Sequence, residues 1–298
     1  MARAFNKSRR LVSAGRDRLR LWVQIVFTAA TNGYFKGFSE GRIYTGTSKS
    51  LCLPGLNCYS CPGALGSCPI GSLQAVLASR NFSISFYLTG FFLLVGTLLG
   101  RIVCGWLCPF GLIQDLIYRI PFLRKIKKVP GDRVLRFVKY GILLVFVILL
   151  PMFVVDIVGQ GEPWFCKWIC PSGTLMAGWP LVFRNEGIQQ AVGLLFLWKN
   201  AILFLFIFLS VIIYRPFCKY ICPLGAIYGL FNRVSFIRLR IDRSRCVHCH
   251  ACTRACKMNV QVEENPDSME CIRCGSCVSA CGQKALAIRA DRRDSQLR

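Results

Sequence analysis

The chain has 298 residues, 54% of them hydrophobic, and a formal net charge of +24. Its mean hydropathy of +0.45 is too high for an ordinary soluble domain, so we expect an integral membrane protein. The 18 cysteines exceed what packing needs. Because disulfide-dense scaffolds are small and loop-rich, the composition favours metal binding over a disulfide framework.

Four apolar segments are candidate membrane helices. The first, residues 21–35, follows a strongly basic segment, residues 1–20. No small-residue cleavage site of convincing form comes after it, so we expect an uncleaved helix rather than a signal peptide. The other three are residues 82–103, 137–158 and 197–214. Each approaches the ~20 residues that cross a hydrocarbon core, and Lys199 can extend from the last one to the headgroups.

The basic residues divide unevenly among the loops. Segments 1–20, 101–139 and the chain from residue 215 onward contain seven, nine and fifteen Lys and Arg, whereas loops 39–81 and 159–199 contain three each. By the positive-inside rule we expect a multi-pass protein of the cytoplasmic membrane with both termini in the cytoplasm. Because topology explains the positive charge, the expected partner is the lipid bilayer and not nucleic acid.

A C-P-x-G-x-[L/I] motif occurs four times, starting at Cys68, Cys108, Cys170 and Cys222. In three copies another cysteine lies four residues earlier, at Cys104, Cys166 and Cys218. Proline suits the first turn of a helix, and the glycine lets backbone approach a bulky ligand. The motif cysteine is therefore expected at a helix N-terminus, where the dipole favours an anionic centre such as a thiolate-bound cluster.

The predicted topology sorts these motifs into an inner-face and an outer-face group. The inner-face group is a complete four-thiolate set, which we expect to hold one [4Fe-4S] cluster: Cys104, Cys108, Cys218 and Cys222. The outer-face group offers six cysteines: Cys52, Cys58, Cys61, Cys68, Cys166 and Cys170. By symmetry, the expected ligands of an outer cluster are Cys61, Cys68, Cys166 and Cys170, with Cys58 as the alternative to Cys61. Cys52 and the remaining cysteine could form a disulfide, and disulfides outside or idle thiols inside stay alternatives to clusters.

From about residue 235 the chain becomes polar and basic, which predicts three parts: a basic N-terminus (1–20), a membrane domain (21–234) and a cytoplasmic domain (235–298). The last part contains two C-x2-C-x2-C-x3-C runs, the spacing of bacterial two-cluster ferredoxins, in which the fourth cysteine of each run binds the other cluster. The predicted ligands are Cys246, Cys249, Cys252 and Cys281 for cluster one and Cys271, Cys274, Cys277 and Cys256 for cluster two. A zinc site is the disfavoured alternative.

Other residues limit the chemistry. The proline that usually follows the last cysteine of each run is replaced by Lys257 and Gly282, which affects turn geometry more than ligation. His248 and His250, the only histidines, lie within the first run, so a membrane haem held by paired histidines is excluded for this chain alone. Trp106, Trp168 and Tyr220 are interpreted as aromatic-belt residues rather than cluster neighbours. No catalytic nucleophile–base pair or phosphate-binding loop is evident.

With these motifs in view, the chain resembles the four-span membrane polyferredoxins. That family includes the quinol-oxidising NapH-type subunit of periplasmic nitrate reductase systems and the membrane part of nitrous-oxide-reductase regulators. The resemblance rests on Cys104-Gly-Trp-Leu-Cys108-Pro109, on Cys218-Lys-Tyr-Ile-Cys222-Pro223 with the residues up to Tyr228, and on the two tail runs. It implies electron transfer through [4Fe-4S] clusters. The additional outer-face cysteines depart from the NapH-type pattern and favour redox centres on both faces.

The predicted fold is therefore an α-helical membrane protein with four transmembrane helices, interfacial C-x3-C-P helices and a C-terminal two-cluster ferredoxin domain. We expect an electron-transfer subunit that connects a cytoplasmic donor with a membrane or extracytoplasmic acceptor, with redox proteins as partners. A quinol dehydrogenase subunit, which would need a quinone pocket, is the first alternative. A membrane thiol–disulfide relay and a redox sensor are the others.

Overall fold

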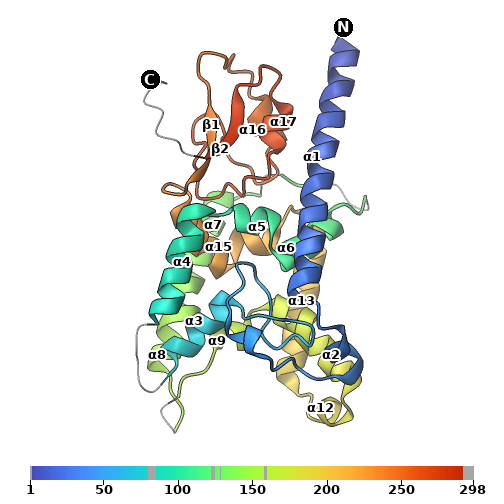
Figure 1. Cartoon of the computed structure of the whole chain (residues 1–298), viewed down its shortest axis with the longest axis vertical. Helices are drawn as coiled ribbons and strands as arrows, with labels where there is room; N and C mark the ends of the chain where they lie inside the picture. The colour runs from blue at the N-terminus through green and yellow to red at the C-terminus, as the bar shows by residue number, and fades with distance from the viewer. Residues whose placement is uncertain (1, 80–84, 122–124, 128, 158–159, 291–298) are drawn as a thin grey trace.

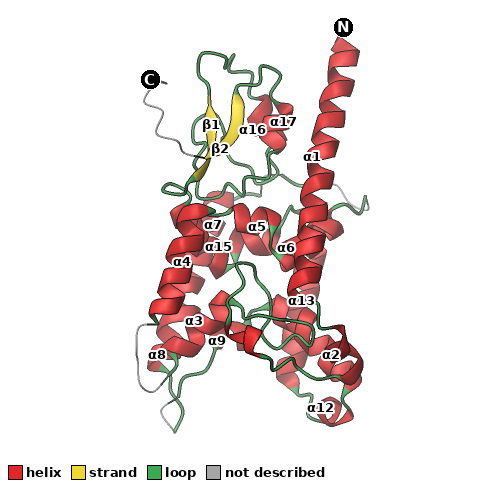
Figure 2. Cartoon of the chain, in the orientation of Figure 1, coloured by secondary structure: helices red, strands yellow, loops and turns green. Residues whose placement is uncertain are grey.

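The computed structural model describes residues 2–79, 85–121, 125–127, 129–157 and 160–290, with side chains from residue 15 onward. In these ranges the chain is mostly helical, and its β-structure is one two-stranded sheet near the C-terminus, as Figure 2 shows. The C-terminal part lies at one end of the molecule, beside the N-terminal half of the long helix α1 (Ala2–Thr31) (Figure 1).

Two helices of the described chain are long and apolar enough to cross a membrane. One is a continuous run, Asp132–Phe153, made of α7 (Asp132–Ile142), the π-helical η2 (Leu143–Leu149) and α8 (Leu150–Phe153). The other is α13 (Leu194–Ile212). They match the predicted segments 137–158 and 197–214 closely, although residues 158–159 lie outside the described chain.

The other two predicted membrane segments take different forms. Segment 82–103 becomes the 13-residue α4 (Phe86–Leu98), which stops before Gly100, a residue with left-handed backbone at φ +55°. Residues 82–84 lie outside the described chain. Residues 21–31 of segment 21–35 form the C-terminal part of α1, which runs without interruption from the basic N-terminus and ends before Asn32-Gly33. The structure therefore supports two of the four predicted spans by length and composition.

Short helices carry the cysteine motifs. The helices that contain or follow the predicted inner-face cysteines are α5 (Ile102–Trp106), α6 (Pro109–Tyr118), α14 (Pro216–Tyr220) and α15 (Pro223–Phe231). Those of the other motifs are α3 (Pro69–Leu77), α9 (Trp164–Trp168) and α10 (Pro171–Gly173). The remaining elements of this part are α2 (Phe35–Glu40), η1 (Thr47–Ser50), η3 (Thr174–Gly178), α11 (Trp179–Arg184) and α12 (Glu186–Gln190).

The C-terminal part has its own small core. Strands β1 (Ile237–Ile241) and β2 (Leu286–Ala290) pair in antiparallel register, with Leu239 opposite Ile288. Two one-turn helices, α16 (Ala251–Ala255) and α17 (Ser276–Ala280), contact each other. Leu239, Val262 and Leu286 are buried among the tail cysteines. So few apolar side chains form a thin core, and a bound metal cluster would supply much of the missing stabilisation.

Candidate metal centres

Each C-P-x-G motif adopts the predicted local structure. The four motif cysteines are the N-cap residues of α3, α6, α10 and α15, with proline at the first helical position. In the Cys108 motif the N–H of Gly111 donates to the cysteine sulfur at 3.4 Å, and in the other three motifs the corresponding glycine N–H lies near the sulfur without a cap hydrogen bond. Because these N–H groups have no intrahelical partner, the motif directs both a thiol and a hydrogen-bond donor toward one point.

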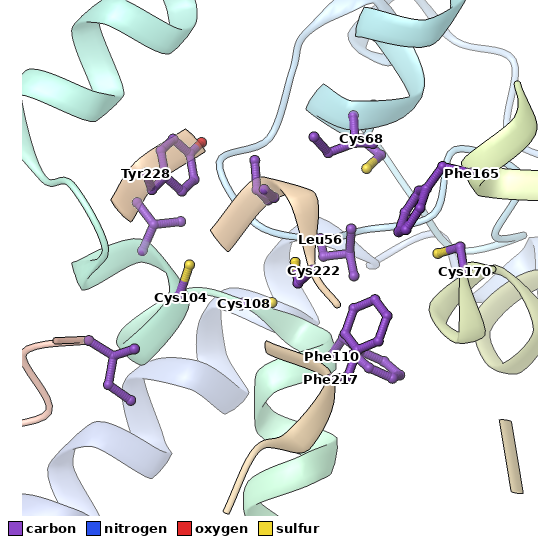
Figure 3. Close-up of a cluster of buried hydrophobic side chains, with 14 of the residues drawn as sticks. Leu56, Cys68, Cys104, Cys108, Phe110, Phe165, Cys170, Phe217, Cys222 and Tyr228 are labelled. Atoms are coloured by element: carbon purple, nitrogen blue, oxygen red, sulfur yellow. The ribbon is translucent and has the colours of Figure 1, made fainter. Parts of the chain in front are cut away.

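The predicted inner-face cysteines come together between α5 and α14, and we name this set the α5–α14 group: Cys104, Cys108, Cys218 and Cys222. All four are buried, and Cys222 is close enough to the other three for their thiolate charges to act on its sulfur. Figure 3 shows the sulfurs of Cys104, Cys108 and Cys222 in one region of the core. Gln114 adds a side-chain donor, its Nε2 lying 3.1 Å from the Cys218 sulfur.

Two buried arginines connect the two cysteine pairs of this group, each donating to a backbone carbonyl of the opposite pair. Arg101, three residues before Cys104, donates to the carbonyl oxygen of Cys218 at 3.1 Å. Arg215, three residues before Cys218, donates to the carbonyl oxygen of Cys104. Both guanidinium groups approach the motif glycines so closely that a Cβ at either glycine would lie 3.1 Å from them. The positive charges thus lie where a cluster bound by four thiolates would be negative.

The second set forms between α3 and α9, and we name it the α3–α9 group: Cys58, Cys68, Cys166 and Cys170. Cys166 is within electrostatic range of the other three sulfurs. Gln74, six residues after Cys68, lies 3.2 Å from the Cys166 sulfur, just as Gln114 follows Cys108 by six and contacts Cys218. The two groups are therefore built alike.

The structure places Cys58, the sequence alternative, inside this group. Its sulfur would lie 3.8 Å from a Cβ on the motif glycine Gly173, and it is within electrostatic range of Cys68 and Cys170. Cys61, the residue that symmetry favours, is buried beside Cys58 and Lys49. Cys52 lies apart, with its sulfur 3.5 Å from the hydroxyl of Ser72. All 18 cysteines are free thiols in this structure.

Two lysines take the places of the arginines at the α3–α9 group. Lys199 donates to the carbonyl oxygen of Cys166 at 3.3 Å. Lys49 is buried, donates to the carbonyl oxygen of Ala64 at 2.8 Å and is within electrostatic range of Cys58 and Cys61. Burial lowers the pKa of Lys49, and the neighbouring thiols oppose that shift.

The two groups are joined by one residue of the 51–68 loop. Leu56 lies close to the sulfur of Cys108 and is only two residues from Cys58. Figure 3 shows Leu56 between Cys222 and Cys170. Gly55 fits against the Cys108 backbone so tightly that a Cβ there would lie 3.1 Å from Cys108 Cα. Cysteines of both groups thus belong to one continuous buried core.

The tail cysteines line two separate cavities, divided as the ferredoxin spacing predicts. One, of about 280 Å³, is lined by Cys246, Cys249, Cys252 and Cys281. The other is lined by Cys256, Cys271, Cys274 and Cys277. Burial raises the pKa of Cys271 to about 12, so this thiol is protonated at neutral pH until a cation displaces its proton.

The second tail cavity lies against the α5–α14 group. Gly105, next to Cys104, touches the backbone of Ile272, next to Cys271; a Cβ on Gly105 would lie 2.4 Å from the Ile272 carbonyl oxygen. The indole N–H of Trp106 donates to the carbonyl oxygen of Arg273 at 3.1 Å. Trp106 is therefore a contact residue of the tail, where the sequence suggested only an aromatic belt.

Buried polar side chains hold this contact together. Glu270 accepts from Arg101 at 2.9 Å and from Lys139. Although burial acts in the opposite direction, the charges of Arg101 and Lys139 bring the pKa of Glu270 below its ordinary value. The side-chain amide of Asn232 donates to the carbonyl oxygens of Ser268 and Cys271 at 2.9 and 2.8 Å. Helix α1 adds Arg16, which donates to the carbonyl oxygen of Gly275 at 3.4 Å.

The donor sets fit [4Fe-4S] clusters better than single ions. Among the described residues, no three His, Cys, Asp or Glu side chains converge on a point where one metal ion would fit. A cubane cluster instead takes one thiolate on each of four irons, so its ligands surround a larger group. The buried amide of Asn57, beside Cys58, has no protein hydrogen-bond partner, as expected of a donor that faces a bound group.

Sequence reasoning missed the residues that surround the thiols. Arg101 and Arg215 each lie three residues before the first cysteine of a pair, so the repeated motif is R-x2-C-x3-C-P. This longer repeat can be read from the sequence alone. Gln74 and Gln114 likewise recur six residues after a motif cysteine. His248 and His250 are largely exposed, and their Nδ1 atoms lie 3.2 and 3.0 Å from the carboxylate of Glu263.

Comparisons with known proteins agree with the cysteine chemistry. Residues 84–130, 140–185 and 195–243 match a family described as 4Fe-4S binding domain, and residues 238–282 match a 4Fe-4S dicluster domain. Ferredoxin-type protein NapH of Haemophilus influenzae is 28% identical over 194 residues, which cover 64% of this chain and 60% of NapH. No solved structure matches the chain.

Two further relatives are similar over a slightly smaller share of the chain. Methylamine utilization ferredoxin-type protein MauN of Methylobacillus flagellatus is 29% identical over 177 residues, 56% of this chain and 50% of MauN. An uncharacterized protein of Methanocaldococcus jannaschii is 30% identical over 177 residues, 57% of each chain. The matched region thus spans between half and two thirds of the length of these relatives.

Proposed function

Because the chain belongs to the 4Fe-4S ferredoxin-type polyferredoxins related to NapH and MauN, and is thus a ferredoxin-type electron transport protein, we propose that it conducts electrons across a membrane. The electrons pass from a cytoplasmic donor through four [4Fe-4S] clusters to an extracytoplasmic acceptor. The tail domain holds clusters one and two, the α5–α14 group holds a third and the α3–α9 group holds a fourth. The clusters supply the redox chemistry, and the chain positions and tunes them.

The continuity of contacts between neighbouring cysteine sets carries this proposal. Residue Ile272 of the cluster-two run touches Gly105, beside Cys104. Gly55 packs against the backbone of Cys108, and Leu56, two residues before Cys58, lies close to the Cys108 sulfur. Each junction therefore involves a residue adjacent to a ligand, or the ligand itself. A set of unconnected structural thiols would not need this succession, whereas an electron conduit does.

The proposed ligands follow the geometry. We assign cluster one to Cys246, Cys249, Cys252 and Cys281, and cluster two to Cys256, Cys271, Cys274 and Cys277. The third cluster takes Cys104, Cys108, Cys218 and Cys222. For the fourth we assign Cys58, Cys68, Cys166 and Cys170, using Cys58 in place of Cys61 because of its proximity to the other three sulfurs.

The proposed topology places four helical segments in a cytoplasmic membrane, with both termini and the tail domain in the cytoplasm. The two long apolar helices, the shorter apolar α4 and the likeness to NapH support a membrane location. The loop asymmetry of Lys and Arg supports the orientation. In this arrangement the α5–α14 group lies near the cytoplasmic face and the α3–α9 group lies toward the opposite face.

A quinol dehydrogenase subunit is the second candidate, and one observation bears on it. An apolar groove on α1, lined by Trp22, Val26 and Phe27, reaches Leu107, the neighbour of Cys108. A lipid-soluble quinone could approach a cluster there. Its lining offers almost no polar group to bind the quinone oxygens, and ligand sites normally combine an apolar wall with several directed polar groups. We therefore rank transmembrane conduction first.

Vesicles with reductant inside and an impermeant acceptor outside test the proposal, with the tail domain facing the reductant. Wild-type protein should reduce the acceptor. The variant Cys166→Ser should retain the tail-cluster signals and lose delivery to the outside, whereas Cys52→Ser, at a cysteine outside the α3–α9 group, should conduct normally. Unchanged transfer in Cys166→Ser would remove the fourth cluster from the pathway and favour conduction along the inner face only.

A further inference from the structure

The two tail cavities differ sharply in their exposure. The cavity of the cluster-two cysteines is covered by α5, by the end of α15 and by α1, through Gly105, Asn232 and Arg16. The cavity of the cluster-one cysteines opens to the surface, where Cys249 is exposed. Val247 is 61% exposed beside it. An electron that enters the chain from a soluble protein would therefore reach cluster one first.

Basic side chains surround this opening. Arg245 and Arg254 line it and are exposed, and Arg243 is exposed two residues before Arg245. The acidic groups nearby are Asp242, 3.2 Å from Arg245; Glu263, whose carboxylate lies against His248 and His250; and the exposed Glu264. Among the charged residues that line the opening, Arg245 and Arg254 stand against Glu263 alone, and the exposed Lys284 lies between the lining residues Gln283 and Ala285. With the histidines neutral, the four cations outnumber the three carboxylates, so the net charge at the opening is positive.

We propose that the surface around Val247 and Cys249 is the docking site of an acidic, soluble one-electron carrier protein, which exchanges electrons with cluster one. We name it the Val247 surface. An exposed apolar centre within a ring of charge suits a transient redox encounter, whose buried area is small and whose rate depends on electrostatic steering. This inference rests on the proposed function, because it identifies the partner at the cytoplasmic end of the conduit.

Stopped-flow absorbance tests the surface on full-length protein in nanodiscs, with reduced plant-type ferredoxin as the acidic carrier. At low ionic strength the clusters should be reduced rapidly, and the second-order rate constant should fall by about tenfold or more between 20 mM and 500 mM KCl, as steered association does. The double variant Arg243→Glu/Arg245→Glu should lose about tenfold at low salt. The matched double variant Arg233→Glu/Arg289→Glu, which has the same net charge away from the opening, should stay within about twofold of wild type.

Photoreduced deazaflavin, a small reductant that needs no docking, separates the possible failures. It should reduce wild type and both double variants alike. If it does so while ferredoxin reduces the wild type and Arg243→Glu/Arg245→Glu equally fast, the Val247 surface is overturned and the conduit stands. If deazaflavin reduces no tail cluster in the wild type, both proposals fail. Should the glutamate variant not assemble its clusters, Arg243→Gln/Arg245→Gln serves instead, with a rate loss of about threefold as the expected result and wild-type rates as the contrary one.

Discussion

Glu270 is the residue whose replacement most directly probes the contact between the tail domain and the α5–α14 group. Its carboxylate is nearly buried and binds two fully buried cations, Arg101 at 2.9 Å and Lys139. Removing one partner of a buried ion pair costs about 3–5 kcal/mol, because the remaining charge stays without compensation. Glutamine keeps a hydrogen-bond acceptor in place, so we take the lower end of that range for Glu270→Gln.

A loss of about 3 kcal/mol corresponds to about a 100-fold rise in the population of the opened contact. Hydrogen–deuterium exchange of residues 268–274 reports this opening, because exchange through local opening follows its equilibrium constant. We expect exchange in this segment to become about 100-fold faster in Glu270→Gln. Glu264→Gln, the same change at an exposed acid of the same domain, should leave it unchanged.

Equal exchange in Glu270→Gln and wild type would refute the reasoning, because the buried ion pair would then contribute nothing to the docking of the tail. Faster exchange over the whole tail domain, including β1 and β2, would point to global loss of the fold instead. The segment-specific effect is thus the diagnostic result.

Three other substitutions test other parts of the account. Gly105→Ala forces a Cβ to within 2.4 Å of a backbone oxygen, so it should destabilise the folded protein by about 1–3 kcal/mol in thermal unfolding, whereas Gly90→Ala, with open space around it, should not. Cys58→Ser should lower the iron content by about four atoms per chain and Cys61→Ser should leave it unchanged; the reverse pattern would restore the ligand set expected from symmetry. Gln114→Leu removes a hydrogen bond to a cysteine sulfur, so redox titration should show one cluster potential lowered by on the order of 50 mV, and an unchanged potential would exclude that bond from tuning.

The sequence predicted the local chemistry better than the packing. Proline and glycine fix the first turn after each motif cysteine, so the N-cap positions follow from residues within one short segment. The ferredoxin spacing likewise anticipates the two tail cavities. The helices Asp132–Phe153 and Leu194–Ile212 were predictable because each contains a long apolar run.

The remaining features depend on contacts between distant segments. Symmetry with the inner set favoured Cys61 over Cys58, three residues earlier, and only the fold of the 51–68 loop brings Cys58 toward Gly173. Arg101 binds a carbonyl 117 residues away, which no local pattern reveals. Segment 82–103 is apolar enough for a long helix, yet the left-handed backbone at Gly100 ends it early and turns Arg101 into the core.

Iron content is the most direct test of the central claim that the α3–α9 group holds a cluster. Full-length protein purified without oxygen should contain about sixteen iron atoms and as many inorganic sulfides per chain, which corresponds to four [4Fe-4S] clusters. Cys166→Ser should reduce both numbers to about twelve while the tail-cluster spectra persist. A wild-type value of about eight to twelve, unaffected by Cys166→Ser, would contradict the claim and leave these cysteines as thiols or disulfides.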